Sequence, residues 1–145
     1  MNRESAYAAL FARIQGIGGW QSSSRDFFSF EESVRPQPAF CFLVHTQIPE
    51  NTPNLPACWR LPVEIYVYHT FNNPSLFRST VLNGYIQAIE DALRLQSGER
   101  QMGRDAQTTL GGACQRAWIS GPVQLYTGIP EAQAVAIVPV DVTII

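Results

Sequence analysis

The sequence predicts an α+β domain in which a mixed or mostly antiparallel sheet of four to five strands is flanked by two helices. Two segments show the spacing of partly buried helices, and other segments show the continuous or alternating apolar pattern of strands. The chain has 145 residues, of which 46% are hydrophobic and 15% are charged, so it is long enough for one core and too apolar for disorder. No repeat or linker divides it, and we expect a single domain over residues 1–145.

The N-terminal segment predicts a helix over residues 3–15. Its buried stripe follows the three-and-four spacing of one helix face and consists of Tyr7, Leu10, Phe11 and Ile14. The helix is expected to end at Gly16, Gly18 and Gly19, because glycine accepts left-handed backbone angles. Residues 26–30 then predict a short edge strand.

Two apolar segments, residues 39–46 and 59–70, predict a pair of strands. In the second segment one face consists of Leu61, Val63, Ile65 and Val67, and the other of Arg60, Glu64, Tyr66 and Tyr68. The connection, residues 47–58, contains three prolines and is expected to be an extended loop. A connection of this length suits an antiparallel pair.

A second helix is expected over residues 76–95, with Ser75 as its N-cap. Its buried stripe consists of Val81, Leu82, Tyr85, Ile86, Ile89, Ala92 and Leu93. Residues 96–109 are polar and contain glycine, which is typical of a mobile surface loop. Residues 110–120 predict a weaker strand, and a turn at Gly121 and Pro122 follows it.

The last segment, residues 134–145, predicts a long strand that is apolar on both faces. Both faces must then be covered by neighbouring strands, helices or another chain. Pro139 cannot donate a hydrogen bond to a neighbouring strand, so it predicts a sheet edge or a bulge. Because an apolar edge in water promotes aggregation, a partner subunit is one candidate for covering it.

The composition argues against several classes of protein. The formal charge is −2 and all ten basic residues are arginine, which disfavours a dedicated nucleic-acid-binding protein. The N-terminus lacks the apolar core and cleavage site of a signal peptide, and no run of about 18 apolar residues predicts a membrane span. Cys41, Cys58 and Cys114 show no paired spacing and are expected to be free thiols in a reducing cytoplasm.

The candidates for catalysis or metal binding are His45 and His69, which lie at predicted strand ends, together with Cys41 or Cys114. These are the residue types of a Cys–His dyad or a metal site, but no two of the four share a ligand-type spacing. The glycines of residues 16–19 follow a helix rather than a strand, which is the wrong context for a dinucleotide site. We therefore predict no catalytic residue, no metal and no cofactor.

Aromatic residues are concentrated after the first helix: Trp20, Phe27, Phe28 and Phe30. Stacking on nucleic-acid bases requires basic neighbours, and only Arg25 and Arg35 are near. We expect these aromatic side chains to pack over the sheet or against a partner.

Five segments occur in one order along most of the chain: RESAYAALFARIQG, WRLPVEIYVYHT, LNGYIQAIEDAL, the stretch from Thr109 to Gly121, and QAVAIVPVDV. Together they resemble the tail terminator proteins of long-tailed bacteriophages, the group similar to minor tail protein U. The resemblance implies a fold with helices flanking a sheet and a non-enzymatic, hexameric ring. Such a ring caps the head-proximal end of the tail tube, ends tube growth and offers the surface for head attachment.

The resemblance also implies the partners. These are further copies of the chain, the tail tube protein and a head–neck connector protein, while viral DNA passes through the ring without sequence-specific binding. The expected location is the virion tail, after assembly in the host cytoplasm, with no membrane involved. The candidate contacts to a neighbouring subunit or the tube are Asn72, Asn73, Arg100, Arg104 and Ile145.

Two other interpretations stay open at this point. One is a head-completion or head–tail connector protein of the neck, which would remain on filled heads that lack tails. The other is a small thiol- or histidine-dependent hydrolase using His45, His69 and a cysteine. Mutation of both histidines would abolish activity in that case.

Overall fold

The computed structural model describes residues 1–29, 37–70, 78–99, 107–127 and 133–145. In chain order its elements are α1 (Arg3–Gln15), β1 (Ser22–Ser24), β2 (Ala39–Val44), β3 (Ile48–Glu50), β4 (Cys58–Thr70), α2 (Arg78–Ala92), the 3₁₀ turn η1 (Leu110–Gly112), β5 (Arg116–Ile119), β6 (Gln124–Tyr126) and β7 (Gln133–Ile144). The predicted α+β class is confirmed. Neither described helix combines the length and apolarity that a membrane span requires.

The described strands form one seven-stranded sheet with the order β1-β2-β4-β7-β5. In addition, β3 pairs with β4, and β6 pairs with β7. Among these pairs only β1 with β2 is parallel. The central pair is β4 with β7, whose register runs from Trp59 opposite Ile144 to Thr70 opposite Gln133. The sheet has more strands than predicted because β3 and β6 have three residues each, too few to show an alternating pattern.

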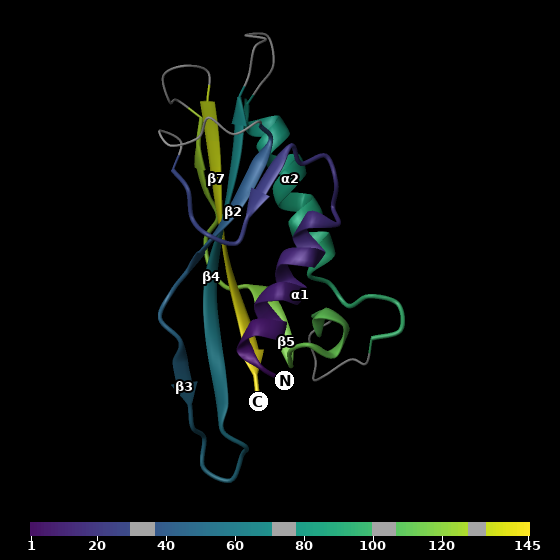
Figure 1. Cartoon of the computed structure of the whole chain (residues 1–145), viewed down its shortest axis with the longest axis vertical. Helices are drawn as coiled ribbons and strands as arrows, with labels where there is room; N and C mark the ends of the chain where they lie inside the picture. Colours follow the sequence, from purple (N-terminus) through teal and green to yellow (C-terminus); the bar gives the residue numbers. More distant parts are fainter. Residues whose placement is uncertain (30–36, 71–77, 100–106, 128–132) are drawn as a thin grey trace.

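Both helices lie on one face of the sheet (Figure 1). The carboxamide oxygen of Asn2 caps α1 by accepting a hydrogen bond from the backbone N–H of Ser5 at 2.7 Å. After α1, Gly18 and Gly19 take positive φ angles, as expected for residues that end a helix. The core between helices and sheet includes the fully buried side chains of Leu10, Ile14, Leu61, Val63, Ile65, Leu82 and Ile89.

On the face of the sheet away from the helices, the chain segment after β1 covers part of the surface. The hydroxyl of Tyr68 donates a hydrogen bond to the carbonyl oxygen of Phe28 at 2.6 Å, and Phe27 packs edge-on against Tyr66. On the helix side, Trp20 packs against Phe40 and stacks on Tyr85. Of the two predicted alternatives, packing over the sheet or against a partner, Trp20 and Phe28 follow the first, while Phe27 contacts Tyr66 but stays 44% exposed. Phe30 lies outside the described residues.

The prediction that Pro139 marks an edge or a bulge is wrong, because β7 lies between β4 on one side and β5 and β6 on the other. Pro139 lies opposite the gap between these two short strands, where its carbonyl accepts a hydrogen bond from the N–H of Ser120 at 3.0 Å. In a strand, the N–H and the carbonyl of one residue point toward the same neighbouring strand. The N–H that Pro139 lacks would therefore point at the gap between β5 and β6, so the sheet loses little hydrogen bonding.

Three other predicted elements need correction. The edge strand after α1 is Ser22–Ser24 rather than residues 26–30. The segment 110–120 splits into η1 and β5, because Gly111 and Gly112 take positive φ angles that no strand accommodates. The described part of helix α2 ends at Ala92, three residues before the predicted end, and Ser75 lies outside the described residues.

Candidate interaction surfaces

The predicted loop of residues 47–58 is instead the outer part of a β-hairpin that projects from the end of the sheet (Figure 1). We call residues 48–60 the arm. Its two strands pair from Ile48 opposite Arg60 to Glu50 opposite Cys58. A short two-stranded hairpin has little stability of its own, so contacts at its base must hold it in place.

On the helix side, the base of the arm is held by α1. The guanidinium group of Arg3 lies 4.5 Å from the ring centre of Trp59, a cation–π contact between α1 and β4. Gln47, which directly precedes β3, donates a hydrogen bond from its amide nitrogen to the hydroxyl oxygen of Tyr7 at 3.2 Å. Both contacts fix the entry of the arm relative to the body.

On the opposite face, three charged side chains from three strands hold the same base. The Nε of Arg60 lies 3.2 Å from a carboxylate oxygen of Glu50 on β3, and its Nη1 lies 3.4 Å from a carboxylate oxygen of Asp141 on β7. The Asp141 side chain is only 9% exposed, so this pair is less screened by solvent than a surface pair. The arm is therefore held on both faces.

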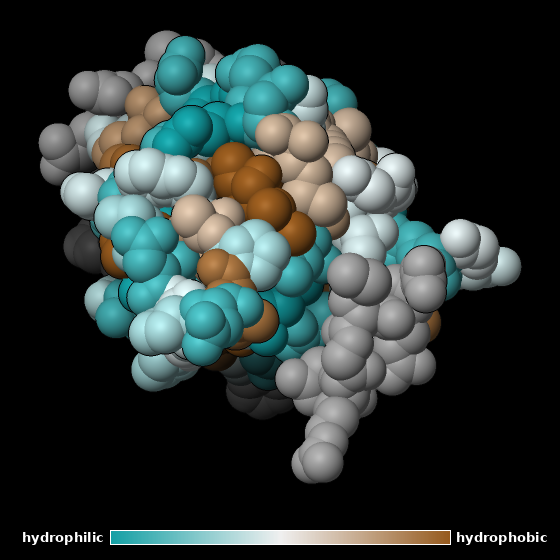
Figure 2. Space-filling model, turned by 90° about the horizontal axis from the view of Figure 1, so that it is seen from below, coloured by the Kyte–Doolittle hydropathy of each residue, from teal (hydrophilic) through white to brown (hydrophobic). Residues whose placement is uncertain are grey.

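The tip of the arm, residues 51–57, contains no charged residue. Asn54 takes a positive φ of 67°, which asparagine tolerates better than most residues, and the N–H of Leu55 donates to the carbonyl of Thr52 at 3.1 Å. This turn leaves the Leu55 side chain 65% exposed. Figure 2, which shows the molecule from below, has apolar side chains at the surface of this end among polar ones.

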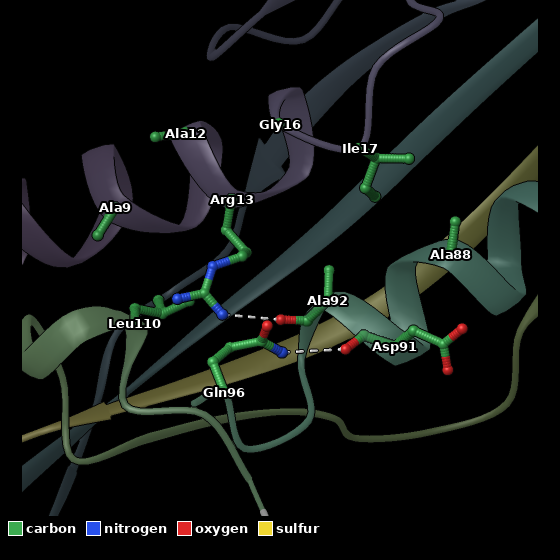
Figure 3. A pocket seen from close by; sticks show the side chains of 10 residues that line it. All are labelled: Ala9, Ala12, Arg13, Gly16, Ile17, Ala88, Asp91, Ala92, Gln96 and Leu110. Atoms are coloured by element: carbon green, nitrogen blue, oxygen red, sulfur yellow. Dashed lines mark hydrogen bonds between the residues drawn. The ribbon is translucent and has the colours of Figure 1, made fainter. Parts of the chain in front are cut away.

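A groove of about 750 Å³ lies between α1 and α2 (Figure 3). Its apolar lining consists of Ala9, Ala12, Ile17, Ala88, Ala92 and Leu110. The small alanine side chains leave the space between the helices open. Arg13 crosses from α1 toward the end of α2, where its Nη1 donates to the carbonyl of Ala92 at 2.9 Å.

Beside this groove, the carboxylate of Glu99 joins three segments that are distant in the sequence. Its oxygens accept hydrogen bonds from Arg13 Nη2 at 3.2 Å, Thr108 Oγ1 at 2.8 and 2.9 Å, and the N–H of Gly111 at 3.1 Å. The backbone N–H of Gln96 donates at 3.1 Å. Burial by itself raises the pKa of Glu99, but these hydrogen bonds outweigh it and lower the pKa to about 2.

The Glu99 contacts correct the prediction of a mobile polar loop at the two described ends of residues 96–109, while residues 100–106 lie outside the described residues. Glu99 is 7% exposed at its side chain and Thr108 is fully buried, so both ends of this segment belong to the folded body. Nothing in the local sequence marks Glu99, because its partners come from α1 and from the stretch after residue 107. These hydrogen bonds join the segment after α2 to α1 and to η1, so the carboxylate of Glu99 holds three parts of the fold together.

The residues of the hypothetical Cys–His site do not come together. His45 hydrogen-bonds to Glu64 of β4, and burial lowers the pKa of His69, farther along the same strand. Cys41 and Cys114 are both buried, and burial raises the pKa of Cys114 to about 12, which opposes a thiolate nucleophile. Within the described ranges, no three His, Cys, Asp or Glu side chains are grouped as a metal site requires.

Of the predicted interface residues, Asn72, Asn73, Arg100 and Arg104 lie outside the described residues. Ile145 follows β7 directly and is 52% exposed. Sequence reasoning predicted an extended loop over residues 47–58 and missed their hairpin structure, because the three residues of β3 include a proline. The groove had only one sequence signal, the alanines that accompany the apolar stripes of both helices.

The chain matches no protein-family model and no curated protein sequence. It is similar in structure to a chain from the virion of a native gene transfer agent particle, with a TM-score of 0.53. This similarity covers 94% of the chain and 92% of the other chain at 10% sequence identity. At this identity the likeness shows a shared fold along nearly the whole of both chains.

Proposed function

We propose that this chain is a virion structural protein of a tailed bacteriophage or a phage-like particle. The observation that carries the proposal is the shared fold with a chain of a gene transfer agent virion, which extends over 94% of this chain. The five segments that resemble tail terminator proteins support the same class independently of the structure.

More specifically, we propose that the chain is a tail terminator that forms a hexameric ring on the head-proximal end of the tail tube. A ring of identical chains needs two different patches on each subunit, each complementary to the other. The arm and the α1–α2 groove support the proposal because they are two different surfaces on separate parts of the molecule (Figure 1). Such a ring stops tube growth by covering the last tube ring without offering a further docking surface.

The proposed partners follow from this position: the tail tube protein on one face of the ring and a head–neck connector protein on the other. Viral DNA passes through the ring without sequence-specific binding, which agrees with a formal charge of −2. No reaction is assigned to the chain, and its proposed location is the virion tail after assembly in the host cytoplasm.

Deletion of the gene tests the proposal, with tails measured by electron microscopy. Tubes of abnormal length, or tails that do not join filled heads, are the expected result, and supply of the intact chain should restore both. Tails of normal length that join heads without the protein contradict the terminator role. If the protein is instead found on filled heads that lack tails, it is a neck connector.

A further inference from the structure

We infer that the α1–α2 groove receives the tip of the arm of a second copy of this chain. The inference rests on the proposed function in one respect, since it names the contact by which neighbouring subunits of the ring join. Its parts are otherwise found on the single chain: an exposed, uncharged tip and an open groove whose lining is partly apolar.

The arm is organised for binding before a partner arrives. Its base is fixed by Trp59 under Arg3 on one face and by Arg60 between Glu50 and Asp141 on the other. The prolines at 53 and 56 restrict the backbone on both sides of Leu55. Docking of this tip therefore loses less conformational entropy than docking of a flexible loop.

The tip and the groove match in polarity. Residues 51–57 carry no charge, so a receiving surface must not leave charged groups buried and unpaired beneath them. In the groove, Arg13 is already bound to the carbonyl of Ala92, to Thr108 and to Glu99. At the rim, the Asp91 carboxylate accepts from Gln87 at 3.0 Å and faces Arg94 at 3.7 Å. The apolar walls are thus available to a leucine side chain.

The tip must enter the groove of another molecule. The arm extends away from the two helices (Figure 1), and the contacts at its base hold it in that direction. A contact between two different patches is heterologous, so repetition of the same contact closes a ring when the rotation between subunits fits. The arm and groove therefore provide the kind of contact that a ring requires.

A second groove, of about 410 Å³, is the main competitor. It lies between α2 and β5, is lined by Trp118, Ile119 and Val123, and is flanked by the charged residues Glu90 and Arg94. Its smaller volume leaves less room for the tip. It provides the matched control for the experiment.

The test uses sedimentation velocity on the full chain at concentrations up to about 1 mM, where even weak contacts are populated. Wild type and the conservative variant Leu55→Met are expected to form a ring. Leu55→Asp puts a negative charge on the tip and Ala88→Glu puts one in the groove. Each variant alone should sediment as a monomer, and its circular dichroism spectrum should match that of the wild type. Leu55→Ala should weaken each contact by about 10- to 100-fold.

Mixing the two blocked variants gives the decisive result. The Ala88→Glu chain still has an intact tip and the Leu55→Asp chain an intact groove, so an equimolar mixture should form a 1:1 dimer and nothing larger, because the remaining acidic tip and acidic groove repel each other. The control Val123→Glu, in the competing groove, should still form rings. Rings from either blocked variant alone, a mixture that stays monomeric, or loss of rings in a folded Val123→Glu chain each overturn the inference.

The outcomes also separate this inference from the proposed function. A wild-type chain that stays monomeric overturns the inference, while a terminator that assembles only on tubes remains compatible with the gene-deletion test. Conversely, rings that depend on Leu55 and Ala88 support the inference even if the protein is then found outside the virion.

Discussion

Replacement of Glu99 by glutamine is expected to lower the free energy of unfolding by about 2–3 kcal/mol at neutral pH. The pKa of this carboxyl falls from an ordinary value of 4.5 to about 2 in the folded chain. That difference, at about 1.4 kcal/mol for each pH unit, gives about 3 kcal/mol of stabilisation of the ionised form. Glutamine keeps the shape but directs an N–H₂ group at surrounding donors, so most of this stabilisation is lost.

The pH dependence gives a further check. Because the pKa of Glu99 is lowered by folding, its stabilisation is fully present above the ordinary pKa of 4.5 and is lost as the pH falls toward about 2. Urea unfolding of wild type and Glu99→Gln at several pH values should show a difference that shrinks over this window. At neutral pH, a loss of about 3 kcal/mol lowers Tm by about 10 °C.

The matched control is Glu90→Gln, because Glu90 is 49% exposed and pairs with Arg94 at the surface. Its expected effect is below about 0.5 kcal/mol. A difference between wild type and Glu99→Gln of less than about 1 kcal/mol, or one that does not change between pH 7 and pH 2, would refute the assigned role of this carboxylate.

Two further predictions concern buried groups. In the native protein at pH 8, a thiol reagent should modify Cys58 first and leave Cys41 and Cys114 unmodified. The reason is that, of these three cysteines, only Cys58 is partly exposed, and burial raises the pKa of Cys114 to about 12. Fast labelling that persists in the Cys58→Ser variant would contradict this prediction. Tyr68→Phe removes the hydrogen bond to the Phe28 carbonyl and should cost about 1 kcal/mol in urea unfolding. Tyr126→Phe, which changes an exposed hydroxyl, should cost less than about 0.5 kcal/mol, and equal costs for the two variants would count against the packing of Phe28 on the sheet.

The sequence predicted the long elements well because their patterns repeat often enough to be read. Helix α1 matches its predicted bounds, and β4 and β7 have long apolar faces, so residues 59–70 and 134–145 were placed correctly as strands. The antiparallel pairing of β2 with β4 followed from the length of their connection and is confirmed.

The failures arose where distant parts of the chain decide the structure. Pro139 suggested an edge, yet it is tolerated inside the sheet because β5 ends and β6 begins opposite it. Glu99 looked like a solvated loop charge, although Arg13, 86 residues away, and Thr108 enclose it. The candidate site was predicted only in part, because the arm depends on Arg3 and Asp141 as much as on its own residues.

The most direct measurement of the central claim is an electron cryo-microscopy reconstruction of the particle that this chain's gene helps to build, with the chain identified in the density. The account predicts a single ring of copies between the tail tube and the neck, with the arm of each copy directed at its neighbour. Density for the chain only on heads without tails, or its absence from the particle altogether, would contradict the account.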